Sequence, residues 1–187
     1  IGGITITGLN PDSQQGDKVI LDILKRCGGK FKPVEGGYHF DRSLLKATEI
    51  DLADCPDLGP ILFTLGCFCS GETVIRNAGR LRLKESDRID AMRDELQKMG
   101  ARIDVEGDSV HIQGVALHAP NAPLSGHNDH RIVMALAVAA IASGLPALLC
   151  GAEAVEKSWP AFWNVLRSLG AKIELSSDRK EDFDIKA

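Results

Sequence analysis

The stretch that decides the fold is LQKMGARIDVEGDSVHIQG, which runs from Leu96 to Gly114. A helical pattern stops at a glycine, a short apolar segment follows, and the chain then turns back on itself. We expect Gly100 to be a left-handed helix C-cap and residues 101–105 to form a strand. The Glu-Gly-Asp sequence at 106–108 is typical of a hairpin turn, so a second strand should follow it.

Two other stretches of the chain end a helix in the same way. LKRCGGKF begins at Leu24 and LRSLGAKI begins at Leu166, so that Gly28 and Gly170 coincide with Gly100. Apolar residues stand four and eight positions before each glycine, which marks one buried helix face. These residues are Leu24, Leu96, Leu166, Ile20, Met92 and Phe162. The coincidence indicates an internal repeat.

A second correspondence lies further upstream in two of the copies. PDLGPILFTLGCFCSG (56–71) matches NDHRIVMALAVAAIASG (128–144), and both predict a helix that starts at an acid and stops at Ser-Gly. The repeat of about 70 residues is therefore strand, helix, strand, helix, strand, strand (βαβαββ), and its first copy is truncated at the front. This predicts an α/β domain over residues 1–175. The third copy should close with residues 151–173, and the charged tail 176–187 is expected to fray.

Composition narrows the classes of function. The chain has 22 Lys plus Arg against 26 Asp plus Glu, so no general basic field exists to hold nucleic acid or an anionic membrane. A single tyrosine and the lack of aromatic residues interleaved with basic ones also disfavour a nucleic-acid module. The five cysteines lack C-x-x-C spacing, which disfavours a zinc site and suits reduced core residues of a cytoplasmic protein.

No segment reads as a membrane span or a targeting signal. The most apolar run, residues 132–142, falls far short of the roughly 20 residues that cross a bilayer. The sequence lacks an initiating Met and opens inside the strand-like GGITITG. We therefore expect a fragment of a longer protein.

The densest polar clusters lie where helices should begin. Asp57 opens one helix and Asp129 opens another, while Ser86 and Ser158 are the expected N-caps of two more. Bases accompany these starts, although a helix N-terminus carries about half a positive charge and disfavours them. The bases are Lys84, Arg88, Arg131 and Lys157, with Glu85 and His130 beside them.

Helices of one repeated unit should run roughly parallel, which would gather these starts at one end of the domain. Lys84 and Arg88 would then lie on one side and would repel each other unless an anion sits between them. Backbone N–H groups, helix dipoles and cations would together bind a phosphate or carboxylate. Glu85 would be available for proton transfer if burial brought its pKa toward neutrality.

Each residue also has a simpler interpretation. Glu85 and Arg88 could form a surface ion pair worth less than about 1 kcal/mol. Asp57 could be only a first-turn acid, His130 a helix-start histidine and Lys157 a solvated lysine. The conjunction of all of them at one end favours function over these separate interpretations.

The stretches CPDLGPI, RLRLKESDRI, HNDHRIVMALAVAA and KSWPAFW, in this order and spacing, closely resemble the C-terminal domain of the 5-enolpyruvylshikimate-3-phosphate (EPSP) synthase family. The resemblance runs from ITITGLNPDSQQGD to LGAKIEL, nearly the whole chain. It implies one domain of the enolpyruvyl transferase inside-out α/β barrel, which is built from three βαβαββ repeats. The repeat found from the residues agrees with that fold.

The resemblance implies transfer of the enolpyruvyl group of phosphoenolpyruvate to the 5-hydroxyl of shikimate 3-phosphate, with phosphate released. The family's route is addition and then elimination, without a metal or organic cofactor. Carried over by motif, Asp57 contacts the sugar hydroxyls, Lys84 touches the substrates, and Glu85 is the acid/base at the methylene carbon. The residues implied to hold phosphoenolpyruvate are Arg88, His130, Arg131 and Lys157.

Two departures from the family pattern limit this expectation. The family carries Asn or Glu four positions before the lysine of the motif, whereas Arg80 stands here, so the resemblance assigns Arg80 no role. The N-terminal domain, which supplies most contacts to shikimate 3-phosphate, has no counterpart in these 187 residues. We expect this chain alone to be inactive, because half a cleft neither excludes water nor positions both reactants.

Two other functions compete with this one. The related UDP-N-acetylglucosamine enolpyruvyl transferase shares the repeat fold, but does not show K-E-S-D-R followed by N-D-H-R. A non-catalytic repeat domain whose basic helix starts bind a phosphorylated ligand or a partner protein is the alternative from another class. The sequence does not decide whether the enzyme responds to glyphosate, the family's inhibitor.

Overall fold

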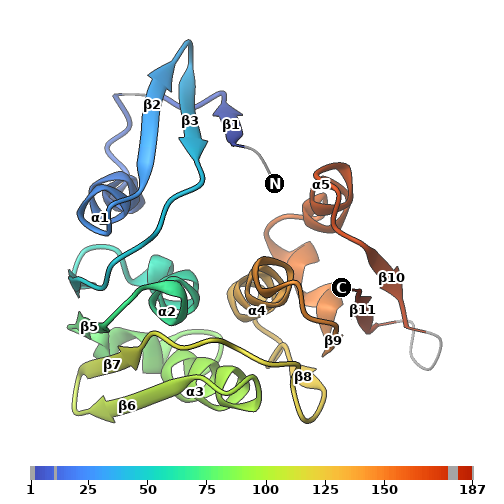
Figure 1. Cartoon of the computed structure of the whole chain (residues 1–187). Coiled ribbons are helices and arrows are strands. Elements are labelled where there is room, and N and C mark those ends of the chain that lie inside the picture. Colours follow the sequence, from blue (N-terminus) through green and yellow to red (C-terminus); the bar gives the residue numbers. More distant parts are fainter. Residues whose placement is uncertain (1–2, 11, 177–180, 187) are drawn as a thin grey trace.

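The computed structural model of the chain describes residues 3–10, 12–176 and 181–186, and three sheets surround a group of helices (Figure 1). Each sheet belongs to one copy of the repeat, so the copies found in the sequence are also the structural units. The second copy contains β4 (Glu49–Asp51), η2 (Pro56–Leu58), α2 (Gly59–Phe68), β5 (Glu72–Arg76), η3 (Ala78–Leu83), α3 (Arg88–Lys98), β6 (Arg102–Glu106) and β7 (Ser109–Gln113).

The four strands of the second copy lie in the order β4-β5-β7-β6. β4 pairs parallel with β5, because the long helix α2 lies between them and carries the chain back to the same end of the sheet. The other pairs are antiparallel. The hairpin expected at residues 106–108 is confirmed, since Glu106 pairs with Ser109 and Gly107 has a φ of 57°.

The third copy repeats this arrangement with the strand order β8-β9-β11-β10. Its tail corrects an expectation, because Phe183–Ile185 does not fray but forms the inner strand β11 between β9 and β10. Residues 177–180 and 187 of the tail lie outside the described residues. The elements are β8 (Leu124–Ser125), α4 (His130–Ser143), β9 (Ala147–Cys150), η4 (Ala152–Lys157), α5 (Phe162–Ser168), β10 (Ile173–Leu175) and β11 (Phe183–Ile185).

The first copy shows only the later part of the repeat, as the sequence predicted. Its strand order β1-β3-β2 matches β5-β7-β6 of the second copy, with antiparallel pairing throughout. Its elements are β1 (Ile4–Thr7), η1 (Gly16–Val19), α1 (Ile20–Arg26), β2 (Lys30–Val34) and β3 (Gly37–Asp41).

The glycine that ends the second helix of each copy adopts the same conformation. Gly28, Gly100 and Gly170 have φ values of 82°, 84° and 95°. The residue after each glycine donates its N–H to the carbonyl of the repeated leucine, as Ala101 does to Leu96 at 3.1 Å. The glycine itself donates to the carbonyl three residues before it, as Gly100 does to Gln97 at 2.9 Å. This pair of bonds is the Schellman motif, and the helix ends expected from the sequence are confirmed.

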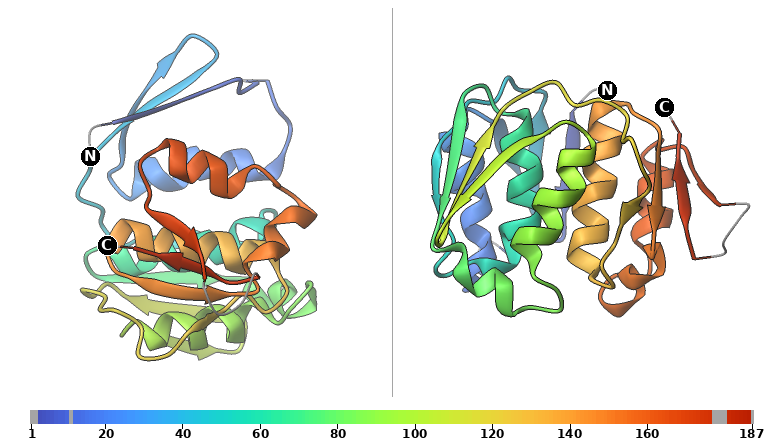
Figure 2. Two further views of the ribbon diagram at one scale, coloured as in Figure 1. Left: turned by 90° about the vertical axis from the view of Figure 1, so that its right-hand side faces the viewer. Right: turned by 90° about the horizontal axis from the view of Figure 1, so that it is seen from below.

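Helices fill the interior and sheets form the outside. In Figure 1 the first sheet lies at the top, the second at the bottom and the third at the right, with α2 and α4 between them. The right-hand view of Figure 2 shows α2, α3 and α4 side by side with roughly parallel axes. Both α2 and α4 are apolar nearly all round, as a helix buried on every side should be. Among the described residues, no helix is long and apolar enough to span a membrane.

Candidate active site

The starts of α2, α3 and α4 meet at one hollow of about 360 Å³. Asp57 lies in η2 just before α2, Lys84 and Glu85 lie between η3 and α3, and Arg131 lies in the first turn of α4. The lining consists of Asp57, Leu83, Lys84, Glu85, Arg88, His130 and Arg131. Six of the seven residues proposed from the sequence are thereby brought together.

Arg88 is the centre of this cluster, and its side chain is only 1% exposed. Its Nε donates to Asp129 at 2.8 Å, its Nη1 to Asp57 at 3.1 Å, and its Nη2 to Glu85 at 2.5 Å. Burial acts to lower the pKa of Arg88, but the hydrogen bonds and charges of these acids outweigh it and raise the pKa. The guanidinium therefore fixes three carboxylates from three separate helix starts.

Asp129 is fully buried and caps α4. It accepts hydrogen bonds from the backbone N–H of Arg131 at 2.9 Å, from Ser86 Oγ at 3.1 Å, and from Arg88. Burial acts to raise the pKa of Asp129, yet the bond from Arg88 and the other donors lower it overall. Asp129 thus stays ionised and ties the start of α4 to the start of α3.

Asp57 bridges the two cations that face the hollow. Its Oδ1 lies 3.0 Å from Lys84 Nζ, and its Oδ2 lies 3.1 Å from Arg131 Nη2. Arg131 also donates to the backbone carbonyl of Asp57 at 3.1 Å. Burial acts to raise the pKa of Asp57, but the hydrogen bond from Lys84 and the charge of Arg131 lower it overall. An ionised carboxylate therefore sits between two bases, where a substrate hydroxyl could donate to it.

Glu85 is less buried than its expected role in proton transfer required. Its side chain is 46% exposed. The reason is its position, because the segment between η3 and α3 runs along the surface of the domain while Arg88 points inward. Glu85 is held at the mouth of the hollow by its bond to Arg88.

His130 presents a buried nitrogen without a partner. Its Nδ1 has no hydrogen-bond partner among the described residues, and the Oδ1 of Asp129 is 4.0 Å away. A buried nitrogen of this kind costs about 1–3 kcal/mol when it is left unpaired. His130 lines the hollow, so a bound group could supply the missing bond.

Lys157 stands apart from the other six residues. It ends η4 and donates from Nζ to the carbonyl and the side-chain oxygen of Asn128, both at 2.5 Å. Asn128 precedes Asp129, so Lys157 contacts the segment that leads into α4 and does not line the hollow. Arg80, whose role the resemblance left open, donates to the carbonyl of Ala53 at 3.1 Å and is likewise outside the lining.

Both serine caps expected from the sequence are wrong. α3 is capped by Asp87, whose carboxylate accepts from the N–H groups of Ile89 and Asp90. A carboxylate favours the helix dipole more than a hydroxyl does. Ser158 is not the N-cap of α5, because that helix begins only at Phe162, after Ala161, and Ser158 instead ends η4. Pro160 pushes the residue before it out of the helical region, which separates η4 from α5.

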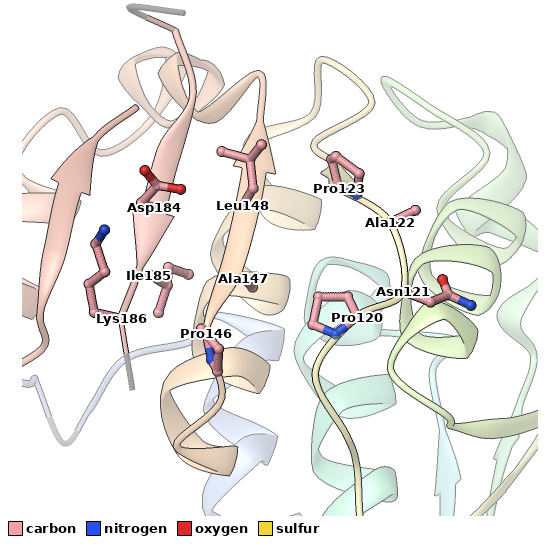
Figure 3. Close-up of a pocket in the computed structure, with 10 residues that line it drawn as sticks. All are labelled: Pro120, Asn121, Ala122, Pro123, Pro146, Ala147, Leu148, Asp184, Ile185 and Lys186. Carbon is pink, nitrogen blue, oxygen red and sulfur yellow. The ribbon is translucent and has the colours of Figure 1, made fainter. Parts of the chain in front are cut away.

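Another hollow of about 350 Å³ lies on the third sheet and is shown in Figure 3. It borders Pro146, which follows the C-terminal end of α4, and so lies away from the helix starts. Its charged lining residues are Asp184 and Lys186, and no further chemistry-bearing side chain lines it. Among the described residues, no cluster of His, Cys, Asp and Glu is placed to hold a metal ion.

Comparison with known proteins shows which proteins the chain is similar to. The family described as EPSP synthase (3-phosphoshikimate 1-carboxyvinyltransferase) matches residues 1–166. Curated proteins of that second name from Clostridium kluyveri and Methanocaldococcus jannaschii are each 42% identical over 92% of the chain. A solved structure of EPSP synthase from Acinetobacter baumannii superposes with a TM-score of 0.73 at 27% identity, over 89% of this chain and 41% of that one. The chain spans about 40% of the length of these curated relatives.

Proposed function

Because the chain belongs to the EPSP synthase family, we propose that it forms one half of the active site of a 3-phosphoshikimate 1-carboxyvinyltransferase. The reaction moves the enolpyruvyl group of phosphoenolpyruvate to the 5-hydroxyl of shikimate 3-phosphate and releases phosphate. The observation that carries the proposal is the meeting of two acids, Asp57 and Glu85, with two partly exposed cations, Lys84 and Arg131, at one hollow.

Arg131 and Lys84 are the side chains best placed to bind the anionic groups of phosphoenolpyruvate. Both are roughly 30% exposed, and both share Asp57 as their partner. Arriving phosphate or carboxylate oxygens could take up their remaining donors without breaking the buried cluster. His130 would donate or accept a hydrogen bond with the anion through its unpaired Nδ1. Arg88 and Lys157 would act from positions behind these binding groups.

The acids carry the proton transfers in this proposal. Glu85, in its protonated form, donates a proton to the methylene carbon as the 5-hydroxyl oxygen bonds to the adjacent carbon, and the tetrahedral intermediate then forms. Asp57 receives the proton of the hydroxyl, and Lys84 beside it passes that proton to the phosphate group. The C–O bond to phosphate then breaks as Glu85 takes a proton back from the new methyl group, and phosphate leaves. The protons gained and lost therefore balance within the two substrates and these three side chains.

The charges of the hollow explain why this chain should be inactive alone. Lys84, Arg88 and Arg131 are matched by Asp57 and Glu85 and by Asp129 behind them. A neutral cluster gives a substrate with two anionic groups little net attraction. We infer that the remaining three fifths of the enzyme's length supply further cations and most contacts to shikimate 3-phosphate.

A chimera tests this proposal. The 172-residue match in the Clostridium kluyveri relative would be replaced by this chain, and phosphate release would be measured with both substrates present. We expect turnover by the chimera and none by the purified chain. A folded chimera without turnover, under conditions where the parent relative is active, would contradict the proposal.

We also propose that the enzyme works in the cytoplasm. Four of the five cysteines, Cys27, Cys55, Cys67 and Cys69, are buried in the core as thiols. Burial raises the pKa of Cys67 and of Cys69 to about 12, so that both stay protonated and unreactive. A reducing compartment suits thiols that serve only as core residues.

A further inference from the structure

The segment that leads into α4 has a backbone that must be held in place. His127 and Asn128 have φ values of 49° and 54°, in the left-handed region that side chains other than glycine rarely adopt. Two such residues in succession cost on the order of 1–3 kcal/mol each. They directly precede Asp129, so their conformation decides where α4 begins and where Arg131 points.

Glu95 holds this segment from the neighbouring helix. It lies in α3 two turns after Arg88, and its side chain is only 4% exposed. Its Oε2 accepts from the backbone N–H of Ser125 at 2.8 Å and from Lys98 Nζ at 2.7 Å. Its Oε1 lies 2.9 Å from His127 Nε2. Since an ionised carboxylate only accepts, His127 carries its proton on Nε2 in this contact.

Further bonds complete the connection between α3 and the segment. Lys98 also donates to the carbonyl of Pro123 at 3.0 Å, and the N–H of His127 donates to Ser125 Oγ at 3.2 Å. Lys157 donates to two oxygens of Asn128, the second left-handed residue. The segment is thus fixed by Glu95 on one side and by Lys157 on the other.

We propose that Glu95 and His127 are positioning residues, which hold the left-handed turn so that Arg131 faces the substrate anion. This inference rests on the proposed function for its effect on turnover, but not for its structural part. Neither residue touches the hollow, so both act through the segment they hold. Loss of the bond should let the turn relax toward ordinary φ values and move the start of α4.

The test compares three variants of the histidine positions. His127→Phe keeps a ring but removes the donor, whereas His127→Gln keeps an N–H donor at a similar reach. His111→Phe is the matched control, because His111 also faces a glutamate, Glu72, at 3.6 Å, but on the second sheet. Both positions are partly exposed, so the three variants should fold.

The first readout uses the isolated chain and needs no substrate. We expect the backbone amide signals of Asp129, His130 and Arg131 to shift in His127→Phe, to return toward the parent positions in His127→Gln, and to stay in place in His111→Phe. Unmoved signals in His127→Phe would overturn the inference, whatever the chimera does.

The second readout uses the chimera. We expect His127→Phe to raise KM for phosphoenolpyruvate about tenfold with a much smaller change in kcat, since misplaced binding groups weaken substrate positioning. His127→Gln should recover most of the loss. An unchanged KM in an active chimera would overturn the inferred link to binding. An inactive parent chimera would count against the proposed function, while the amide shifts would still decide the structural part.

Discussion

The second and third copies of the repeat share their strand order and helix-ending glycines but differ where their second helices begin. α3 spans 11 residues and has a side-chain cap, while α5 spans seven and has none. Counted back from Gly100 and Gly170, Arg88 and Ser158 occupy equivalent positions. Arg88 is a buried guanidinium that holds three carboxylates, whereas Ser158 ends η4 and does not cap α5.

This difference separates what builds the fold from what carries the chemistry. The ends of the helices and the strands that follow are alike in all copies, so they serve the fold. The starts of the helices vary, and only those of α2, α3 and α4 contribute side chains to the hollow. Substitutions at equivalent positions of the two copies can test this separation.

The largest effect on stability is expected at Arg88 and Ser158, the equivalent positions that differ in role. Arg88→Met would leave the fully buried Asp129 without its counter-ion, which should lower the free energy of unfolding by about 3–5 kcal/mol. Ser158→Ala is the matched change in the third copy and should alter the free energy of unfolding by less than about 0.5 kcal/mol. Urea unfolding measures both, and similar losses in the two variants would refute the separation.

A smaller effect is expected at Gly100 and Gly170, the glycines that end the second helix of each copy in the same conformation. Alanine at Gly100 or Gly170 must adopt a left-handed φ, which costs about 1–2 kcal/mol. A Cβ at Gly100 would also lie 2.5 Å from His118 Nε2, whereas at Gly170 it would meet nothing within 4 Å. We expect Gly100→Ala to unfold more easily than Gly170→Ala by about 1 kcal/mol. Equal urea midpoints would show that His118 moves aside freely.

The smallest effect concerns pH. The folded pKa of Asp57 is lowered, so its contribution to stability is present above its ordinary pKa of about 4 and is lost as the pH falls through the folded value. Because Asp57 is 37% exposed, Asp57→Asn should cost less than about 1 kcal/mol at pH 7. That difference should vanish in acid. A gap that persists at low pH would mean that the amide disturbs packing instead.

Much of the fold could be predicted because the same pattern of helix end and strand occurs three times in the sequence. Leu96 and Gly100 have counterparts in each copy, and their pattern fixes the helix face, the helix end and the next strand. The repeat could also have predicted a strand in the tail. The third copy, like the second, should end in two strands, and so needs a strand equivalent to β7. Phe183 and Ile185 supply it, but the surrounding charges in the sequence hid the alternation of that strand.

The site was predicted as a group of residues and not as a network. Charges at helix starts indicated Asp57, Lys84, Arg88 and Arg131 correctly as neighbours. Sequence does not reveal that Arg88 turns inward while Glu85 stays at the surface, because both follow from the path of the chain between η3 and α3. The role of Glu95 in holding the segment before α4 could not be predicted either, because a glutamate within an amphipathic helix gives no sign in the sequence that it is buried.

Glu85→Gln in the chimera tests whether the start of α3 carries the chemistry. Turnover and the affinity for phosphoenolpyruvate would be measured together, with Glu153→Gln, an exposed glutamate of the third copy that does not line the hollow, as the control. We expect Glu85→Gln to lose at least about 100-fold in kcat, as is usual for a general acid–base group, while the affinity changes little. Unchanged turnover in that variant would exclude Glu85 as the acid/base and would favour a domain that only binds its ligand.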